Sequence, residues 1–526
     1  MLIRATDDFR FEWPDPADAN LVWLWDQMHI PRPLPPLAAE LTAQMMARVM
    51  GGRSLIVNGY PYRSFGPPAP AASPGPAGPP LLISVDPMKI WEEEQLPRLK
   101  EIIARIRHRD YGSMSAARLA GSLDELSAEA AEAMSLTFGR AMVFSVASNA
   151  LLDFCEAELG AGAAVKATAM LQGFENESSA SGAGLSRLAE MASGVPGLPE
   201  ALASGSRERV AAVRGSEAFL RQFEAYLDAY GLRAPSWGQM HLPTWSEDPS
   251  VPMKLIARYA SDPQRGPAAA LRRAAQQREE VVREVEARLP PDKLPRFREL
   301  LAAAQRSVPV SEGRALWQLI VSGVMRIPLL ALGRRLVEES GLASPEDVFF
   351  FDVSELQDLA AGHGVPAPRE LAAQRRADLA RWEKLIPPRF LGAQPPAGMT
   401  GMTGMMYRFF GLGVEQSGDA RIVNGIAASK GVVRARARLI LDLGESDRLG
   451  AGEVLVCSST APPWTPLFAI ASAVVSDTGG VLSHTAIAAR EYAIPAVVGT
   501  GVATRRIPDG ATVTVDGGQG IVRIED

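Results

Sequence analysis

The chain has 526 residues, of which 47% are hydrophobic and 22% are charged; this balance excludes wholesale disorder and allows three or four domains. Its 54 basic and 60 acidic side chains give a formal charge of −6, which argues against nucleic acid as the main partner. The two cysteines, Cys155 and Cys457, are too few for a disulfide framework, and the N-terminus lacks the basic and apolar regions of a signal peptide. We therefore expect a cytoplasmic protein that has neither nucleic acid nor a membrane as its partner.

Residues 1–83 are rich in tryptophan, proline and glycine, and they contain a strand-like piece at Ser54–Val57. The run at 66–80 consists of proline, alanine and glycine with a single serine. Because proline fixes φ and removes a hydrogen-bond donor, this run predicts a surface loop with polyproline character.

Residues 84–391 have the composition and spacing of helices. Leu300, Leu301 and Ala304 follow Phe297 at intervals of three and four, which predicts a helix with one apolar face. Proline and glycine clusters interrupt the region at several points, so we expect a large domain of many helices with short connections.

The most apolar stretch of this region, Leu316–Leu332, is interrupted by Gln318, Arg326 and Pro328. A helix that crosses a bilayer needs about 20 nearly uninterrupted apolar residues, so the stretch predicts a buried helix. The aromatic segment 347–353 departs from the helical texture, and we expect it to form a short strand or an extended piece.

A change of texture marks the last part of the chain. Glycine and methionine predominate at 392–406, which predicts a flexible linker over 392–420. In 421–526, Arg434, Arg436 and Arg438 alternate with apolar residues, as in a half-buried strand. Further β runs follow, with short helices expected at Pro466–Ile470 and Thr485–Glu491. The expected fold class is multidomain α and α/β, with a large, mainly helical domain followed by a C-terminal β/α domain.

The segment 478–500, TGGVLSHTAIAAREYAIPAVVGT, predicts a glycine turn, a helix and a buried strand. Gly479 and Gly480 allow the backbone to approach a ligand closely, and Ser483 is a plausible N-cap for the helix that begins near His484. Free N–H groups at a helix N-terminus favour an anion, and a neutral imidazole there can attack a phosphorus atom. A histidine after a glycine pair is also often a capping or core residue.

The segment resembles the swivelling phosphohistidine domain of the phosphoenolpyruvate-utilising enzymes, and the resemblance continues through 424–440, 452–468 and 509–522. It implies that His484 is the residue that is phosphorylated. The residues that would hold the phosphoryl group are Thr478, Gly479, Gly480, Ser483 and Thr485.

Segments 23–37, 230–250 and 325–359 resemble the acceptor-binding domain of rifampicin-phosphotransferase-like proteins, to which residues 1–83 and 84–391 would belong. The resemblance suggests His241 as the base that receives the acceptor's proton, and the acceptor-binding candidates are Arg233, Trp237, Met240, Trp245 and Glu247. Each candidate also has a purely structural explanation. His241 could be a packed histidine, and Arg233 and Glu247 could form structural ion pairs. Trp237, Met240 and Trp245 could belong to the hydrophobic core. The chain departs from the pattern at Leu232 and Gln239, where relatives often have a histidine and an acid.

An ATP-grasp domain precedes the tryptophan-rich segment in that group, yet the segment begins at residue 13 here, and the sequence has no GxxxxGK[ST] loop. We therefore expect ATP and Mg²⁺ on a separate ATP-grasp protein, with no metal site in this chain. The pair would form a hetero-oligomeric dikinase-type phosphotransferase that passes the β-phosphoryl group of ATP through His484 to a small hydroxyl compound, a phenol or an alcohol. The alternatives are a non-catalytic phosphocarrier or regulatory module and a part of a split phosphoenolpyruvate synthase.

Overall fold

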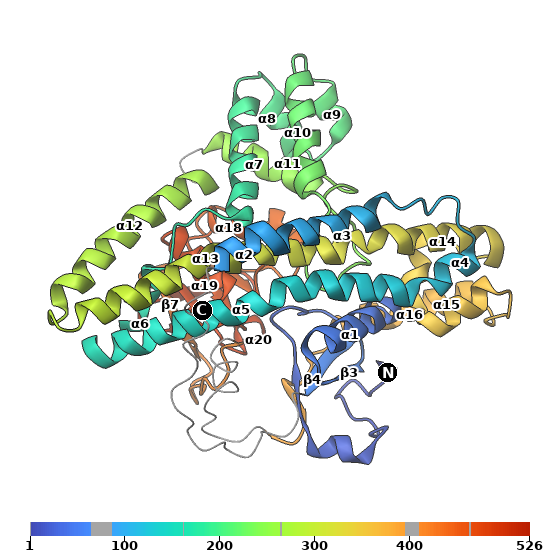
Figure 1. The fold of residues 1–526 in the computed structure, drawn as a ribbon, viewed down its shortest axis with the longest axis horizontal. Coiled ribbons are helices and arrows are strands. Elements are labelled where there is room, and N and C mark those ends of the chain that lie inside the picture. Colours follow the sequence, from blue (N-terminus) through green and yellow to red (C-terminus); the bar gives the residue numbers. More distant parts are fainter. Residues whose placement is uncertain are drawn as a thin grey trace.

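The computed structural model describes residues 2–64, 87–160, 163–262, 266–394, 410–461 and 464–525. The predicted polyproline loop at 66–80 and residues 395–409 of the predicted linker lie outside these described residues. Figure 1 shows a small N-terminal sheet, a layer of long helices with a helical lobe above it, and a C-terminal domain against the helices.

The N-terminal sheet has five strands in the order β1-β3-β4-β2-β5. Its strands are β1 (Leu2–Ile3), β2 (Val22–Trp25), β3 (Arg53–Val57), β4 (Tyr60–Ser64) and β5 (Phe390–Gly392). The strand expected at Ser54–Val57 is therefore confirmed, and it turns into β4 through Asn58 and Gly59, whose positive φ values of 49° and 76° suit a two-residue hairpin. Strand β5 pairs with β2, so the end of the helical region and the N-terminal segment share one sheet.

The central region is helical, as the sequence predicts. Helices α5 and α13 lie side by side as its longest elements, and α7 to α11 form the lobe at the top of Figure 1. Its helices are η1 (Pro16–Asn20), α1 (Pro36–Met50), α2 (Pro87–Ile90), the π-helical turn η3 (Trp91–Gln95), α3 (Leu96–His108), α4 (Ala116–Gly121), α5 (Leu123–Leu159), α6 (Ala163–Ala169), α7 (Glu177–Ser193), α8 (Leu198–Ala203), α9 (Arg207–Ala211), α10 (Glu217–Tyr230), α11 (Ser250–Ser261), α12 (Pro267–Arg288), α13 (Leu294–Val324), α14 (Arg326–Ser340), η5 (Pro345–Phe350), α15 (Val353–Ala360) and α16 (Pro368–Trp382).

The apolar spacing that predicts a helix near residue 300 is confirmed in α13, where Phe297, Leu300, Leu301 and Ala304 are all buried. The stretch Leu294–Ser340 is long and apolar enough to cross a membrane, but 78% of its most apolar window is buried inside the fold. The buried helix predicted for Leu316–Leu332 is thus confirmed as the end of α13 and the start of α14.

The strand or extended piece expected at 347–353 is wrong, because Pro345–Phe350 forms the 3₁₀ helix η5. Ser344 and Asp347 form a capping box at its N-terminus, and Pro345 occupies the first turn. These two local features satisfy the first backbone donors of a helix and outweigh the β preference of the three phenylalanines.

The C-terminal domain contains an eight-stranded sheet in the order β6-β13-β12-β8-β9-β10-β11-β7. Its elements are β6 (Ile422–Asn424), β7 (Ile426–Ser429), β8 (Val432–Leu439), η6 (Leu443–Arg448), β9 (Val454–Cys457), α18 (Thr465–Phe468), β10 (Ala473–Ser476), α19 (His484–Glu491), β11 (Ala496–Val498), α20 (Ala503–Arg506), β12 (Thr512–Asp516) and β13 (Ile521–Ile524). Strands β8 to β11 are parallel. A helical domain followed by a β/α domain is the fold class that the sequence predicts.

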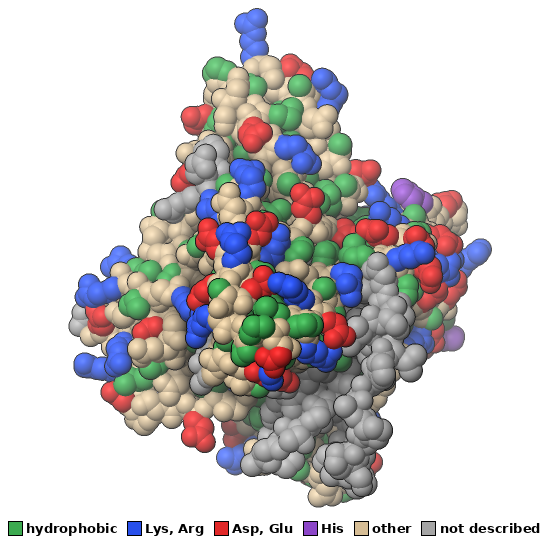
Figure 2. All heavy atoms as spheres, turned by 60° about the vertical axis from the view of Figure 1, so that its left-hand side comes forward, with side chains coloured by type: hydrophobic (Ala, Val, Ile, Leu, Met, Phe, Trp, Pro, Cys, Tyr) green, Lys and Arg blue, Asp and Glu red, His purple; other side chains and the backbone are tan. Residues whose placement is uncertain are grey.

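The C-terminal domain is docked on the helical region. Asp447 of η6 pairs with Lys254 and Arg258 of α11, and Asp442 pairs with Arg32. One hydrophobic cluster contains residues of both α7 to α11 and the C-terminal sheet. Basic and acidic side chains are interspersed over the face shown in Figure 2. The histidine of the 478–500 segment therefore lies against the helical region.

Candidate functional site

His484 lies where a parallel strand feeds a helix. Strand β10 ends at Ser476, a glycine turn follows, and His484 is the first residue of α19. Gly479 has φ of +105°, which only glycine adopts freely, and a β-carbon there would lie 2.6 Å from the Ser483 Oγ. The turn is therefore built for glycine, and it delivers His484 to the carboxyl edge of the parallel strands, where α/β folds bind ligands.

The start of α19 is capped and faces an opening in the surface. The Ser483 Oγ accepts a hydrogen bond from the Ala486 N–H at 3.4 Å, and the His484 Nε2 lies 3.2 Å from the Thr465 Oγ1. The His484 residue is half-buried. A half-buried imidazole at the positive end of a helix is well placed to hold a dianionic group.

The turn residues expected to hold a phosphoryl group lie around His484. Thr478, Gly479, Ser483 and Thr485 line one cavity together with it, whereas Gly480 is not among the lining residues. The Thr478 Oγ1 donates to the Ser458 carbonyl at 3.0 Å, and the Thr485 Oγ1 lies 2.8 Å from the Thr460 Oγ1. These bonds tie the glycine turn and the start of α19 to the segment that follows β9.

The buried side chain of Asp477, to which the sequence patterns assign no role, stabilises the glycine turn. It accepts hydrogen bonds from the Thr500 Oγ1 at 3.2 Å and from the Thr504 N–H at 3.1 Å. Burial raises the pKa of Asp477 above its usual value, although the bonds from Thr504 and Thr500 act in the opposite direction. The side chain ties the glycine turn to the start of α20.

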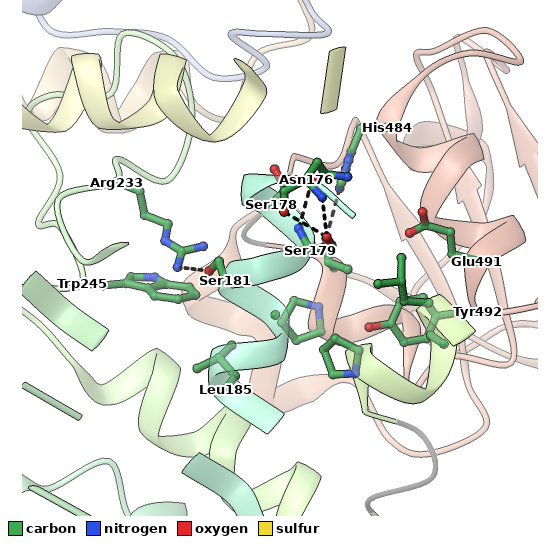
Figure 3. A pocket seen from close by; sticks show the side chains of 16 residues that line it. Asn176, Ser178, Ser179, Ser181, Leu185, Arg233, Trp245, His484, Glu491 and Tyr492 are labelled. Carbon is green, nitrogen blue, oxygen red and sulfur yellow. Dashed lines mark hydrogen bonds between the residues drawn. The ribbon is translucent and has the colours of Figure 1, made fainter. Parts of the chain in front are cut away.

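His484 opens on two hollows. We call the first the α7 pocket; Figure 3 shows His484 near Asn176 and Ser178 at the start of α7, with Arg233 and Trp245 on the far side. The Arg233 guanidinium lies 3.7 Å from the Trp245 ring centroid and donates to the Ser181 Oγ at 2.7 Å. Burial lowers the pKa of Arg233 below its usual value. Two of the predicted acceptor-binding residues thus share a pocket with His484.

We call the second hollow the α13 cavity. It lies between the glycine turn and α13, and its walls include His29, Trp237, Arg314 and Gln318 as well as His484. Trp237 is a third predicted acceptor-binding residue that the structure brings to the histidine. Polar and aromatic side chains from outside the C-terminal domain therefore line both hollows on which His484 opens.

Met240 and Glu247 line neither hollow. Met240 is 2% exposed in the core. Glu247 accepts from the Arg326 Nε at 2.8 Å and from the Thr244 N–H at 3.0 Å. The structure thus places these two residues in the core and in a structural ion pair.

His241 also lies outside both hollows. Its ring packs edge-on against Phe349 at 6.3 Å, and its carbonyl accepts from the Arg326 Nη1 at 2.7 Å. Burial, followed by the charges of Arg326 and Arg32, lowers the pKa of His241 to about 3. A ring with so low a pKa is a weak base at neutral pH.

Because the pKa of His241 falls from 6.5 unfolded to about 3 folded, the unfolded chain binds more protons between these values. The stability from the neutral ring is complete above pH 6.5 and is lost as the pH falls toward 3, by at most about 1.4 kcal/mol per pH unit. We expect His241→Gln to flatten the fall in the free energy of unfolding between pH 6.5 and 4, measured by urea denaturation. His363→Gln, at an exposed position, is the matched control. An unchanged pH slope in His241→Gln would contradict this assignment.

His29 lines the α13 cavity with His484, although the sequence gives it no role. Its Nδ1 lies 2.7 Å from the Asp26 Oδ1. The only sequence signal is an Asp and a His three residues apart in the tryptophan-rich segment. The cavity that His29 shares with His484 forms only in the folded chain, so the sequence does not indicate it.

Within the described parts of the chain, no group of three or more His, Cys, Asp or Glu side chains could hold a metal ion. Cys155 and Cys457 are both buried and unpaired with each other.

Two family models match the chain. Residues 137–312 match the rifampicin phosphotransferase fourth domain, which covers α6 to α12 and parts of α5 and α13. Residues 449–520 match the mobile domain of PEP-utilising enzymes, which contains the glycine turn and His484.

Named relatives extend these matches. Chondramide synthase cmdD of Chondromyces crocatus is 30% identical over 98% of this chain, which covers 14% of that protein. The rifampicin phosphotransferase of Streptomyces sviceus is 33% identical over 60% of this chain and 36% of its own length. The phosphoenolpyruvate synthase of Aeropyrum pernix is 48% identical over 19% of this chain and 12% of its own length. The chain thus spans about a third or less of each of these relatives, and its residues 449–520 belong to the mobile-domain family of the PEP-utilising enzymes.

Proposed function

We propose that this chain is the acceptor and carrier part of a phosphotransferase, in which His484 carries a phosphoryl group to a hydroxyl of a small organic compound. The observation that carries this proposal is that His484 begins a capped helix and opens on two hollows whose far walls belong to the helical region. A purely structural histidine has no need of such an opening.

The chemistry follows from the position of the ring. The phosphorylated His484 would present a dianionic group at the N-terminus of α19, whose positive dipole end stabilises its charge. The acceptor oxygen then attacks phosphorus, the P–N bond breaks, and its electron pair stays on the ring. Splitting one transfer into two steps is the benefit of a covalent carrier, and positioning supplies most of the remaining catalysis.

The source of the phosphoryl group lies outside these 526 residues in this proposal. Mg·ATP bound by an ATP-grasp protein would supply the β-phosphoryl group, and the match of residues 449–520 to the mobile domain of PEP-utilising enzymes supports this division of roles. Two buried, unpaired cysteines fit a reducing cytoplasm as the place of this reaction. With a candidate ATP-grasp protein, we expect label on His484 from [β-³²P]ATP and none from [γ-³²P]ATP; the reverse pattern would contradict a dikinase.

The acceptor would be a phenol or an alcohol. Trp245 and Leu185 line the α7 pocket, and Trp237 and Leu319 line the α13 cavity, so each hollow offers an apolar wall beside a few polar groups. A hollow beside the 230–250 segment favours a small acceptor, whereas a carrier that docks on a protein would present a flat apolar surface there.

The proposal can be tested without a partner protein. Potassium phosphoramidate, a chemical phosphoryl donor for histidine, is used to load the chain, which is then mixed with phenol, benzyl alcohol or pyruvate and followed by ³¹P NMR. We expect a phosphate ester of an alcohol or phenol. Inorganic phosphate alone would contradict a hydroxyl acceptor and favour the phosphocarrier, and phosphoenolpyruvate would favour the split synthase.

A further inference from the structure

The α13 cavity contains a second histidine that is held as a catalytic base is held. The His29 Nδ1 lies 2.7 Å from the Asp26 Oδ1, and the two side chains are 21% and 8% exposed. Burial acts to raise the pKa of Asp26, but the His29 charge and hydrogen bond together with the Arg63 charge outweigh it and lower that pKa below its usual value. Asp26 is therefore a carboxylate that fixes the orientation of the ring by bonding Nδ1.

The other surfaces of the His29 ring are also fixed. The ring stacks on Trp237, with centroids 3.9 Å apart and planes 12° from parallel, and Phe410 meets it edge-on at 5.9 Å. The Ser236 Oγ donates to the His29 carbonyl at 2.6 Å. These contacts come from two other parts of the chain, residues 236–237 and Phe410, so the ring position depends on the assembled fold.

Among the residues that the structure describes, none forms a hydrogen bond with the His29 Nε2, and the residue lines the cavity that also contains His484, Thr478 and Thr485. An imidazole oriented through Nδ1 by a buried carboxylate, with Nε2 left for a substrate, has the arrangement of a general base.

We propose that His29 is the general base of the acceptor site and that Asp26 is its positioning residue; this rests on the proposed function of His484. The acceptor O–H gives its proton to the His29 Nε2 as its oxygen forms the new P–O bond. The P–N bond to His484 breaks, its electron pair remains on the His484 ring, and that nitrogen takes a proton from solvent. His29 then releases its proton to solvent, so no net proton is consumed.

Three charged side chains lie around His29 and the cavity that it lines. Asp26 bonds the ring, and Arg63 lines a smaller pocket that shares His29 and Trp237 with the α13 cavity. Arg314 lines the α13 cavity itself, and its Nη1 is 3.3 Å from the Gln318 Oε1. A phosphoryl group on His484 would add negative charge to the cavity that Arg314 also lines. The cavity thus combines a base with a cation for the transferred group.

The test uses the full chain loaded with potassium phosphoramidate and measures the rate at which phenyl phosphate and inorganic phosphate form. We expect His29→Gln and His29→Phe, the second of which keeps an aromatic ring on Trp237, to load normally at His484 and to transfer about 100-fold more slowly. Asp26→Asn should lose about tenfold, with partial recovery in Asp26→Glu. His363→Gln, at an exposed loop position, is the matched control.

The pH profile separates a base from a structural side chain. The wild-type rate of transfer should rise with pH, because a general base acts in its deprotonated form, and this rise should be absent in His29→Gln. Normal loading with an unchanged transfer rate and profile in both His29 variants would overturn the inference while leaving the function of His484 intact. A wild-type chain that does not load at His484 would instead refute the proposed function, and the inference with it.

Discussion

Replacing His484 by alanine is expected to abolish phosphoryl transfer to phenol, with a loss of at least about a thousandfold. The reason is that the ring is the covalent carrier, so its removal leaves only the uncatalysed reaction. The measurement is the rate of phenyl phosphate formation after treatment with phosphoramidate. Folding should be unaffected, because the His484 residue is half-buried and is the first residue of its helix.

His363→Ala is the control for this experiment, since that side chain is 76% exposed in a loop and lines neither hollow. It should transfer at the wild-type rate. Wild-type transfer in His484→Ala would show that the phosphoryl group does not pass through this ring.

Gly323→Ala is expected to have the largest effect on stability, lowering the free energy of unfolding by about 3 kcal/mol. A β-carbon at 323 would lie 1.7 Å from the Leu232 carbonyl oxygen and 3.0 Å from the Ala234 nitrogen. That nitrogen also donates to the Leu319 carbonyl at 3.0 Å, so two backbone segments meet here without room for a side chain. A shift of residues 232–234 would also move Arg233, which lines the α7 pocket.

The matched control is Gly121→Ala, in α4, where a β-carbon meets no atom within 4 Å. Its stability should be unchanged or raised by up to about 1 kcal/mol, since alanine favours a helix. Urea denaturation measures both variants. Equal stability of Gly323→Ala and the wild type would contradict the close contact between α13 and residues 232–234.

Local patterns predict much of the fold because they depend on neighbours in the sequence. The alternation of Arg434, Arg436 and Arg438 identifies β8, whose outward positions are more exposed than Ala437. Intervals of three and four identify α13. The prediction of a strand or extended piece at 347–353 is wrong because the capping of η5 by Ser344 is a stronger local signal than its phenylalanines.

The candidate site is only partly predictable for a different reason. The glycine turn and the capped helix place His484 by local rules, so a motif can identify it. The choice of partner residues depends on contacts between distant segments: Trp237 reaches His29 across 208 positions, and Arg326 reaches His241 across 85. Sequence neighbourhood suggested His241 as the base, whereas the fold brings His29 to the cavity that contains His484.

The most direct test of the central claim, that His484 carries the phosphoryl group, is to map acid-labile phosphate by mass spectrometry after phosphoramidate treatment of the folded chain. We expect the peptide that contains His484 to be labelled faster than the peptides that contain His108 and His363, although both of these histidines are exposed. Label on His108 and His363 with none on His484 would contradict the claim.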